Sequence, residues 1–102
     1  MKQKEIINQI RTNIERFKNI DGALLIGSFG RNNPTYNSDI DISILANKQF
    51  KIELFLHEIE LLFRNKIKHI LRSELRRKYV IYFTDSPKLE FNICFKLDEL
   101  DM

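Results

Sequence analysis

The sequence predicts an α+β fold in which a small mixed β-sheet has helices packed on one of its faces. Two segments, 2–19 and 50–65, repeat apolar residues at three- and four-residue spacing, which is typical of amphipathic helices. Two shorter segments, 23–27 and 39–45, are rich in Ile and Leu, as buried strands are. The segment 89–96 alternates apolar and polar residues, which indicates a strand with one buried face. The apolar faces of these helices and strands together account for one core.

The composition limits what the chain can be. With 102 residues, 43% of them hydrophobic, we expect one domain over 1–102, either complete or the N-terminal part of a longer chain. The net charge of +3 suits an anionic nucleotide or an acidic partner. A single cysteine, Cys94, excludes an internal disulfide. Because there is no membrane-spanning apolar run and no signal-peptide pattern, we expect a cytoplasmic protein without membrane contact.

The first helix is expected over residues 2–19. Its apolar stripe comprises Ile6, Ile7, Ile10, Ile14 and Phe17. Asp21 and Gly22 are expected to end it. The strand that follows, 23–27, is apolar throughout, which is typical of a central strand covered on both faces.

The second helix is expected to be capped by Asn47 and to run from Phe50 to about Asn65. Residues 66–77 fit two interpretations, since their apolar positions suit either a continued helix or an alternating strand, and both stay open. Around this segment lies a basic run, Arg64, Lys66, Lys68, Arg72, Arg76, Arg77 and Lys78. We interpret it as a solvated helix face; the alternative is a surface that guides a triphosphate or a nucleic acid.

The last part of the chain predicts a β-hairpin. Residues 79–83 are β-branched and aromatic, 84–87 form a turn, and 89–96 form the second strand. One face of that strand carries Leu89, Phe91, Ile93 and Phe95, and the other carries Glu90, Asn92, Cys94 and Lys96.

Asp39 and Asp41 stand at the start of the second expected strand. Side chains at i and i+2 leave the same face of a strand, so these carboxylates should lie side by side. Ile40, Ile42 and Ile44 should point into the core. Two adjacent carboxylates repel each other unless a cation lies between them, and Mg²⁺ fits because it binds through one or two protein carboxylates. The alternative, two solvent-facing aspartates, leaves the pair unexplained.

Gly27 and Ser28 follow the first expected strand. If the chain turns there into a short helix, their amides and the Ser28 hydroxyl face outward at a helix start, which favours phosphate. Carboxylates that bind a metal beside a phosphate site indicate a nucleoside triphosphate. Arg31 is close enough to reach a β- or γ-phosphate with its guanidinium; the alternatives are a helix cap at Ser28 and a plain surface arginine at Arg31.

The Gly-Ser pair, ten intervening residues and the Asp-x-Asp at positions 39 and 41 resemble the signature of a known superfamily. It is the nucleotidyltransferase superfamily with the DNA polymerase β type of palm, and especially its minimal bacterial (MNT-type) members. The resemblance covers residues 22–45 closely and 80–96 more loosely. It implies the palm fold of that superfamily for this α+β chain.

The resemblance also implies a set of site residues. The superfamily places a third carboxylate on a later strand between two apolar residues, and Glu90 between Leu89 and Phe91 matches that pattern. The implied catalytic and metal-binding residues are Asp39, Asp41 and Glu90, and the implied nucleotide-binding residues are Gly27, Ser28, Arg31 and Ser38. Asn32 departs from the small glycine often seen at that place, which puts the path of the loop in doubt.

The implied activity is metal-dependent nucleotidyl transfer. Asp39 and Asp41 would bind one or two Mg²⁺ ions that bridge a nucleoside triphosphate, with ATP as the first candidate, and Glu90 would act where the acceptor hydroxyl is activated. That hydroxyl would attack the α-phosphorus and release pyrophosphate.

The acceptor is not indicated by any motif. We expect the substrate site to be completed by a homodimer partner, a helical partner protein of the HEPN type, or a missing C-terminal domain, docked at the hairpin edge or the open sheet face. The alternative functions are an MNT-type antitoxin that binds or AMPylates a HEPN-type toxin, and a palm-like binding module without catalysis.

Overall fold

The computed structural model describes residues 3–26, 39–84 and 87–95 of the chain. In chain order the elements are α1 (Gln3–Asn13), the 3₁₀ turn η1 (Ile14–Arg16), β1 (Ile20–Ile26), β2 (Ile40–Ala46), α3 (Ile52–Leu62), β3 (Ile67–Ser73), β4 (Lys78–Phe83) and β5 (Leu89–Cys94). In these parts of the chain no helix is long and apolar enough to cross a membrane.

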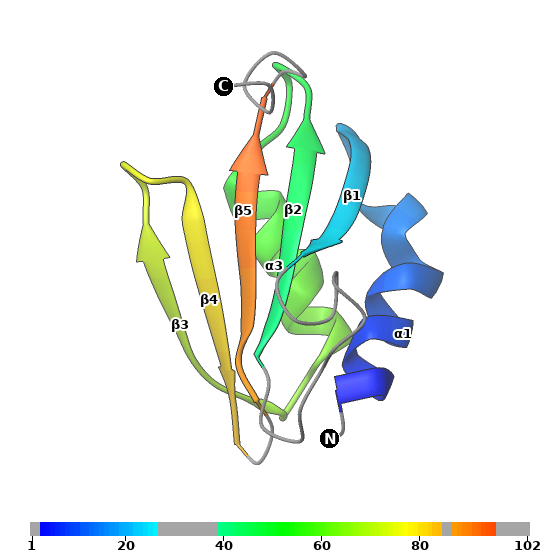
Figure 1. Cartoon of the computed structure of the whole chain (residues 1–102), viewed down its shortest axis with the longest axis vertical. Coiled ribbons are helices and arrows are strands. Elements are labelled where there is room, and N and C mark those ends of the chain that lie inside the picture. The colour runs from blue at the N-terminus through cyan, green and yellow to red at the C-terminus, as the bar shows by residue number, and fades with distance from the viewer. Residues whose placement is uncertain (1–2, 27–38, 85–86, 96–102) are drawn as a thin grey trace.

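The five strands form one mixed sheet in the order β1-β2-β5-β4-β3. The central pair, β2 and β5, is parallel, and the other neighbouring pairs are antiparallel. Both helices lie on the same face of this sheet (Figure 1). The predicted α+β fold, a small mixed sheet with helices on one face, is confirmed.

Strict alternation explains why β2 and β5 occupy the centre. Every second side chain of each strand is buried, beginning with Ile40 in β2 and Leu89 in β5. Because the side chains of a strand alternate between faces, these residues all point toward the helices. The other residues of both strands are only half-buried and form the opposite face, called here the open face.

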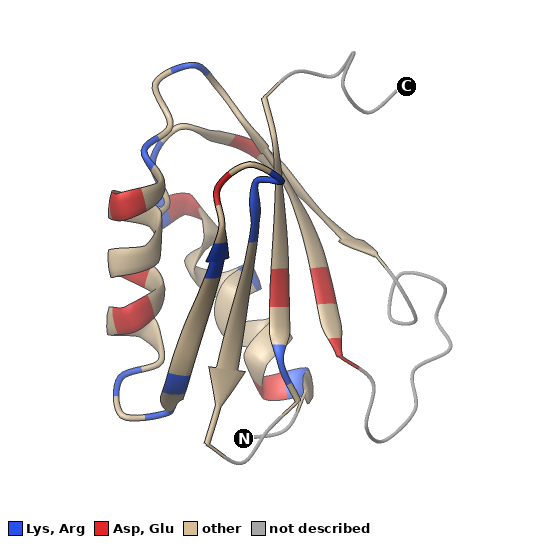
Figure 2. Cartoon of the chain, turned by 90° about the vertical axis from the view of Figure 1, so that its left-hand side faces the viewer, with Lys and Arg blue, Asp and Glu red and all other residues tan. Residues whose placement is uncertain are grey.

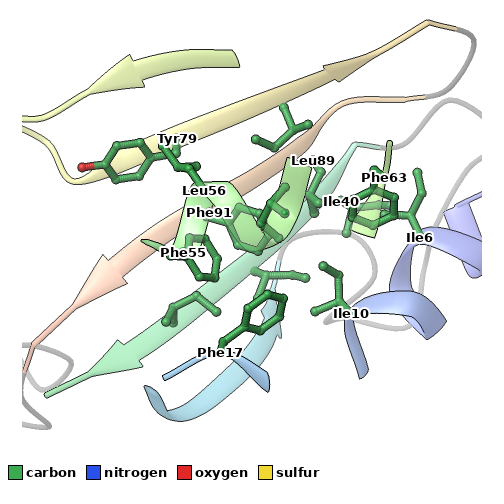
Figure 3. Close-up of a cluster of buried hydrophobic side chains, with 14 of the residues drawn as sticks. Ile6, Ile10, Phe17, Ile40, Phe55, Leu56, Phe63, Tyr79, Leu89 and Phe91 are labelled. Atoms are coloured by element: carbon green, nitrogen blue, oxygen red, sulfur yellow. The ribbon is translucent and has the colours of Figure 1, made fainter. Parts of the chain in front are cut away.

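Aromatic rings join the two layers of the core. Phe55 of α3 packs edge-on against Phe91 of β5, with ring centroids 5.0 Å apart, and it also contacts Phe17 at 5.2 Å and Phe50 at 5.6 Å. Ile6 and Ile10 of α1 complete the same cluster (Figure 3). One continuous core therefore holds both helices on the sheet.

The prediction that residues 23–27 form a central strand covered on both faces was wrong. β1 lies at an edge of the sheet, and Leu24 and Ile26 remain 60% and 37% exposed. The helices cover only one face, so side chains of β1 on the open face meet no second layer among the described residues. An apolar run alone does not distinguish these two environments.

The predicted end of the first helix was also wrong. The α-helix stops at Asn13, continues as η1, and the chain reverses at Asn19, which has a positive φ of 66°. Asp21 and Gly22 belong to β1 instead of ending the helix. Asn tolerates the left-handed conformation, so the turn needs no glycine.

The second helix begins later than predicted, at Ile52, and ends at Leu62. Asn47 does not cap it: its Oδ1 accepts a hydrogen bond from the Gln49 N–H at 2.9 Å, closing a local turn before the helix. Asn65, with a φ of 65°, lies in the turn that follows. Asparagine stabilises such turns as readily as helix starts, which explains the misassignment.

The segment that fitted both a helix and a strand is the strand β3, which pairs with β4. The basic run therefore lies on β3, its flanking turns and the first residue of β4, and its interpretation as a helix face was wrong. The predicted hairpin of 79–83 with 89–96 is confirmed by the antiparallel pairing of β4 and β5. A register shift between Ile67 and His69 interrupts the alternation of β3, and both Ile67 and Ile70 pack against the core.

Candidate active site

The parallel pairing of β2 and β5 places two acidic side chains next to each other on the open face. In the register of these strands Asp41 lies directly opposite Glu90. Figure 2 shows acidic positions at the same level of the two neighbouring strands. The alternation that buries Ile40, Ile42 and Phe91 is the reason that both carboxylates emerge on the face without helices.

The two carboxyl groups interact strongly. Burial, a hydrogen bond with Glu90 and the negative charges of Glu90 and Asp39 raise the pKa of Asp41 from its ordinary 3.8 to about 6, while Lys78 opposes the shift. A shift of this direction means that a second negative charge is unfavourable at this position. A proton or another cation at this pair would therefore reduce the repulsion between the two carboxylates.

Two lysines flank the acidic pair. Lys78 of β4 places its Nζ 3.7 Å from Oε1 of Glu90, and Lys88, just before β5, places its Nζ 3.6 Å from Oδ2 of Asp39. Each ion pair is partly exposed, with 40% of either lysine side chain accessible. The open face thus presents three carboxylates and two ammonium groups around the start of the central strands.

Asp39 lies beside the pair but does not complete a compact cluster. The described residues include no group of three Asp, Glu, His or Cys side chains placed closely enough to hold one ion. Asp41 and Glu90 are the part of the site that the fold itself assembles, with Asp39 held by Lys88.

The donor set fits Mg²⁺. It consists of carboxylate oxygens, which are the ligands a hard divalent cation prefers, and the negative charges of Glu90 and Asp39, which after burial help raise the pKa of Asp41, would be offset by a cation between these groups. Such an ion binds through one or two carboxylates and takes its remaining ligands from water and phosphate. Asp41 and Glu90, with Asp39 beside them, are the residues that would hold it.

Four predicted site residues lie outside the described residues: Gly27, Ser28, Arg31 and Ser38. Their roles in phosphate binding stay predictions.

Lys88 was not predicted from the sequence as a site residue, and Lys78 was predicted only as part of the basic run. Lys88 precedes Glu90 by two residues, so strand alternation alone could have predicted that the two side chains lie on the same face. Its proximity to Asp39, however, depends on the pairing of β2 with β5, which no local pattern reveals.

These observations define the class of protein: an α+β domain with an acidic pair on the helix-free face of a mixed sheet. A family model described as "Polymerase beta, Nucleotidyltransferase" matches residues 8–96, a range that includes Asp39, Asp41 and Glu90. The chain belongs to this polymerase β-type nucleotidyltransferase family. A search among curated proteins finds no match.

Proposed function

We propose that the domain transfers a nucleoside monophosphate from a nucleoside triphosphate, with ATP as the first candidate, to an acceptor hydroxyl. The observation that supports this most strongly is the cross-strand pair of Asp41 and Glu90 within the family match. The pair has the charge and the accessible face that a triphosphate with its metal requires.

The reaction exchanges one phosphorus–oxygen bond for another. The acceptor oxygen forms a bond to the α-phosphorus, the bond from the α-phosphorus to the bridging oxygen breaks, and pyrophosphate leaves with that electron pair. Bound Mg²⁺ supplies positive charge at the attacking and leaving oxygens. In this proposal the Glu90 carboxylate would accept the proton of the acceptor hydroxyl, and Asp39 and Asp41 would hold the ion to which the triphosphate binds.

Lys78 and Lys88 fit the same function. In the absence of a cation each neutralises a carboxylate of the site. With Mg²⁺ held by the carboxylates, the ammonium groups of Lys78 and Lys88 would be available to phosphate oxygens on the open face. The lysines then add to triphosphate affinity without taking part in the chemical step.

Calorimetry tests the proposal. We expect the wild-type domain to bind ATP in the presence of Mg²⁺, and the double variant Asp39→Asn/Asp41→Asn to lose this metal-dependent binding while it stays folded by circular dichroism. Asp21→Asn, which removes a charge from an exposed position of β1, is the matched control and should bind as the wild type does. Unchanged binding by the double variant would contradict the proposal.

The helix-free face favours an acceptor that is presented by a second body. Among the described residues no helix covers the open face, so the acidic pair lies uncovered between β1 and β4. We propose that a partner protein, a second copy or a further domain completes the acceptor site. AMP transfer to a HEPN-type toxin is one form of this proposal, and docking without catalysis is its rival. Incubation with labelled ATP and each candidate partner separates them: label on the partner supports transfer, and stable binding without label supports docking alone.

A further inference from the structure

One side of the sheet ends in β3, whose only strand neighbour among the described residues is β4. Figure 1 shows β3 as the outermost strand on the side away from α1. The outer side of such a strand carries a row of backbone donors and acceptors that a further extended segment can pair with.

This edge is surrounded by positive charge. Arg64, Lys66, Lys68 and Arg76 are all exposed and lie on β3 or in the turns at its two ends (Figure 2). Within residues 64–78 the only acidic side chain is Glu74. Its carboxylate is already engaged, since it accepts hydrogen bonds from Arg72 Nε and from the Tyr79 hydroxyl, both at 2.7 Å.

Arg72 does not contribute to this free positive charge. Besides Glu74 it also contacts Glu53 of α3, so its guanidinium lies between two carboxylates. These carboxylates raise the pKa of Arg72 above its ordinary range. The positive charge of the edge therefore comes from Arg64, Lys66, Lys68 and Arg76, for which the described residues provide no ion pair.

A groove of about 540 Å³ lies next to the same edge, between α3 and β3, and its lining combines apolar side chains with those of His57, Glu60, Arg64 and Asn65. Its lining includes Leu61, Ile67 and Ile70, and Leu61 is 44% exposed. On the opposite side of the strand, Leu71 is 50% exposed on the open face. A segment paired to the edge would thus meet apolar side chains on both of its faces.

We propose that β3 binds an extended acidic segment of a partner protein, which adds a sixth strand to the sheet. Main-chain hydrogen bonds would supply affinity, and the groove would take alternate apolar side chains of the segment. Carboxylates of the segment would pair with Lys66 and Lys68. A second copy of this chain is the wrong occupant, because it would bring another basic β3 against the first.

A peptide selection tests this inference. Random twelve-residue peptides are displayed and selected on the full wild-type chain, and the affinity of the selected peptides is measured by fluorescence anisotropy. We expect Asp and Glu alternating with apolar residues. Binding should weaken about tenfold or more in Lys66→Glu/Lys68→Glu, because two attractive contacts become repulsive. The control Lys4→Glu/Lys18→Glu makes the same charge change at exposed positions before β1 and should bind as the wild type does.

Hydrogen exchange locates the peptide. Amides of β3 should gain protection when the selected peptide is bound, whereas those of β1 should not. The inference is overturned if the peptides show no acidic pattern, if they keep their affinity for Lys66→Glu/Lys68→Glu, or if β3 gains no protection. If a twelve-nucleotide single-stranded DNA binds tightly while the amides of β3 gain no protection from hydrogen exchange, the basic edge would be assigned to nucleic acid. Dimerisation of the wild type through β3 in sedimentation would assign it to a second copy.

Discussion

At the scale of single residues, the raised pKa of Asp41 makes the stability of the domain depend on pH. Burial and the neighbouring carboxylates raise the pKa of Asp41 to about 6, so the folded state holds a proton more tightly than the unfolded chain does. The resulting stabilisation is fully present below the ordinary pKa of 3.8 and is lost as the pH rises through 6. Asp41 therefore weakens the metal-free fold at neutral pH.

Replacing Asp41 by Asn should remove this pH dependence. In buffer with a chelator we expect Asp41→Asn to be more stable than the wild type at pH 7, with the difference shrinking as the pH falls below 6 and vanishing near pH 4. Urea denaturation at a series of pH values measures it. A difference that stays constant with pH would show that the carboxyl does not titrate as the geometry indicates. Asp21→Asn, at an exposed position, serves as the reference.

Lys88 should matter for the nucleotide more than for the fold. Its ion pair with Asp39 is 3.6 Å long and partly exposed, so its loss should change the free energy of unfolding little. If Lys88 reaches a phosphate once Mg²⁺ is bound, Lys88→Met should weaken binding of ATP with Mg²⁺ by about tenfold, as expected for a lost hydrogen bond to a charged group. Calorimetry measures the change. Lys51→Met, at an exposed lysine before α3, is the control. If both variants lose the same affinity for ATP, the effect comes from the net charge of the domain and not from a contact of Lys88 with phosphate.

At the scale of elements, Phe55 is one of the buried residues that hold α3 on the sheet, with Leu56 and Ile59. Its ring contacts three other aromatic rings and is only 3% exposed. Phe55→Ala should lower the free energy of unfolding by about 3–5 kcal/mol, because it removes buried area and leaves a cavity. Leu54→Ala, one residue earlier and 54% exposed, should stay within about 0.5 kcal/mol. Chemical denaturation compares the two, and similar losses in both variants would contradict the assigned core.

At the scale of the whole molecule, the sheet order predicts which parts open first. β2 and β5 have a strand on each side and buried side chains beneath them, whereas β1 and β3 lie at the two edges of the described sheet. Amides of the central strands should therefore exchange only through global unfolding, and those of the edges through smaller openings as well. Native-state hydrogen exchange followed by NMR measures this order. Slowest exchange in β1 would contradict it.

The same order explains the location of the site. Asp41 and Glu90 belong to β2 and β5, which have a strand on each side and buried side chains beneath them. The relative position of the two carboxylates is therefore set by the part of the sheet that is expected to be the most stable. For the proposed function, such a site would be preorganised for its ligand, and the proposed partners would bind at the edges and the open face.

Local patterns in the sequence were sufficient for much of the fold. Period-two alternation correctly predicted the buried faces of β2 and β5, and hence the emergence of Asp41 and Glu90 on the same side as each other. The Gly-Ser pair, ten intervening residues and the Asp-x-Asp together also predicted a family that the match over residues 8–96 confirms. These features were predictable because the direction of a side chain in a strand depends only on its position in that strand.

The tertiary structure decided what depends on neighbours distant in the chain. β1 became an edge instead of a central strand, residues 67–73, which fitted either a helix or a strand, became a strand, and Lys88 came beside Asp39. In each case the local sequence suits two environments, and the choice between them follows from which strands pair and which face the helices cover. The sequence by itself therefore determined the alternation of side chains in the strands and the acidic signature. Only packing determined the strand order, which brings Asp41 next to Glu90 and puts β3 at an edge of the described sheet.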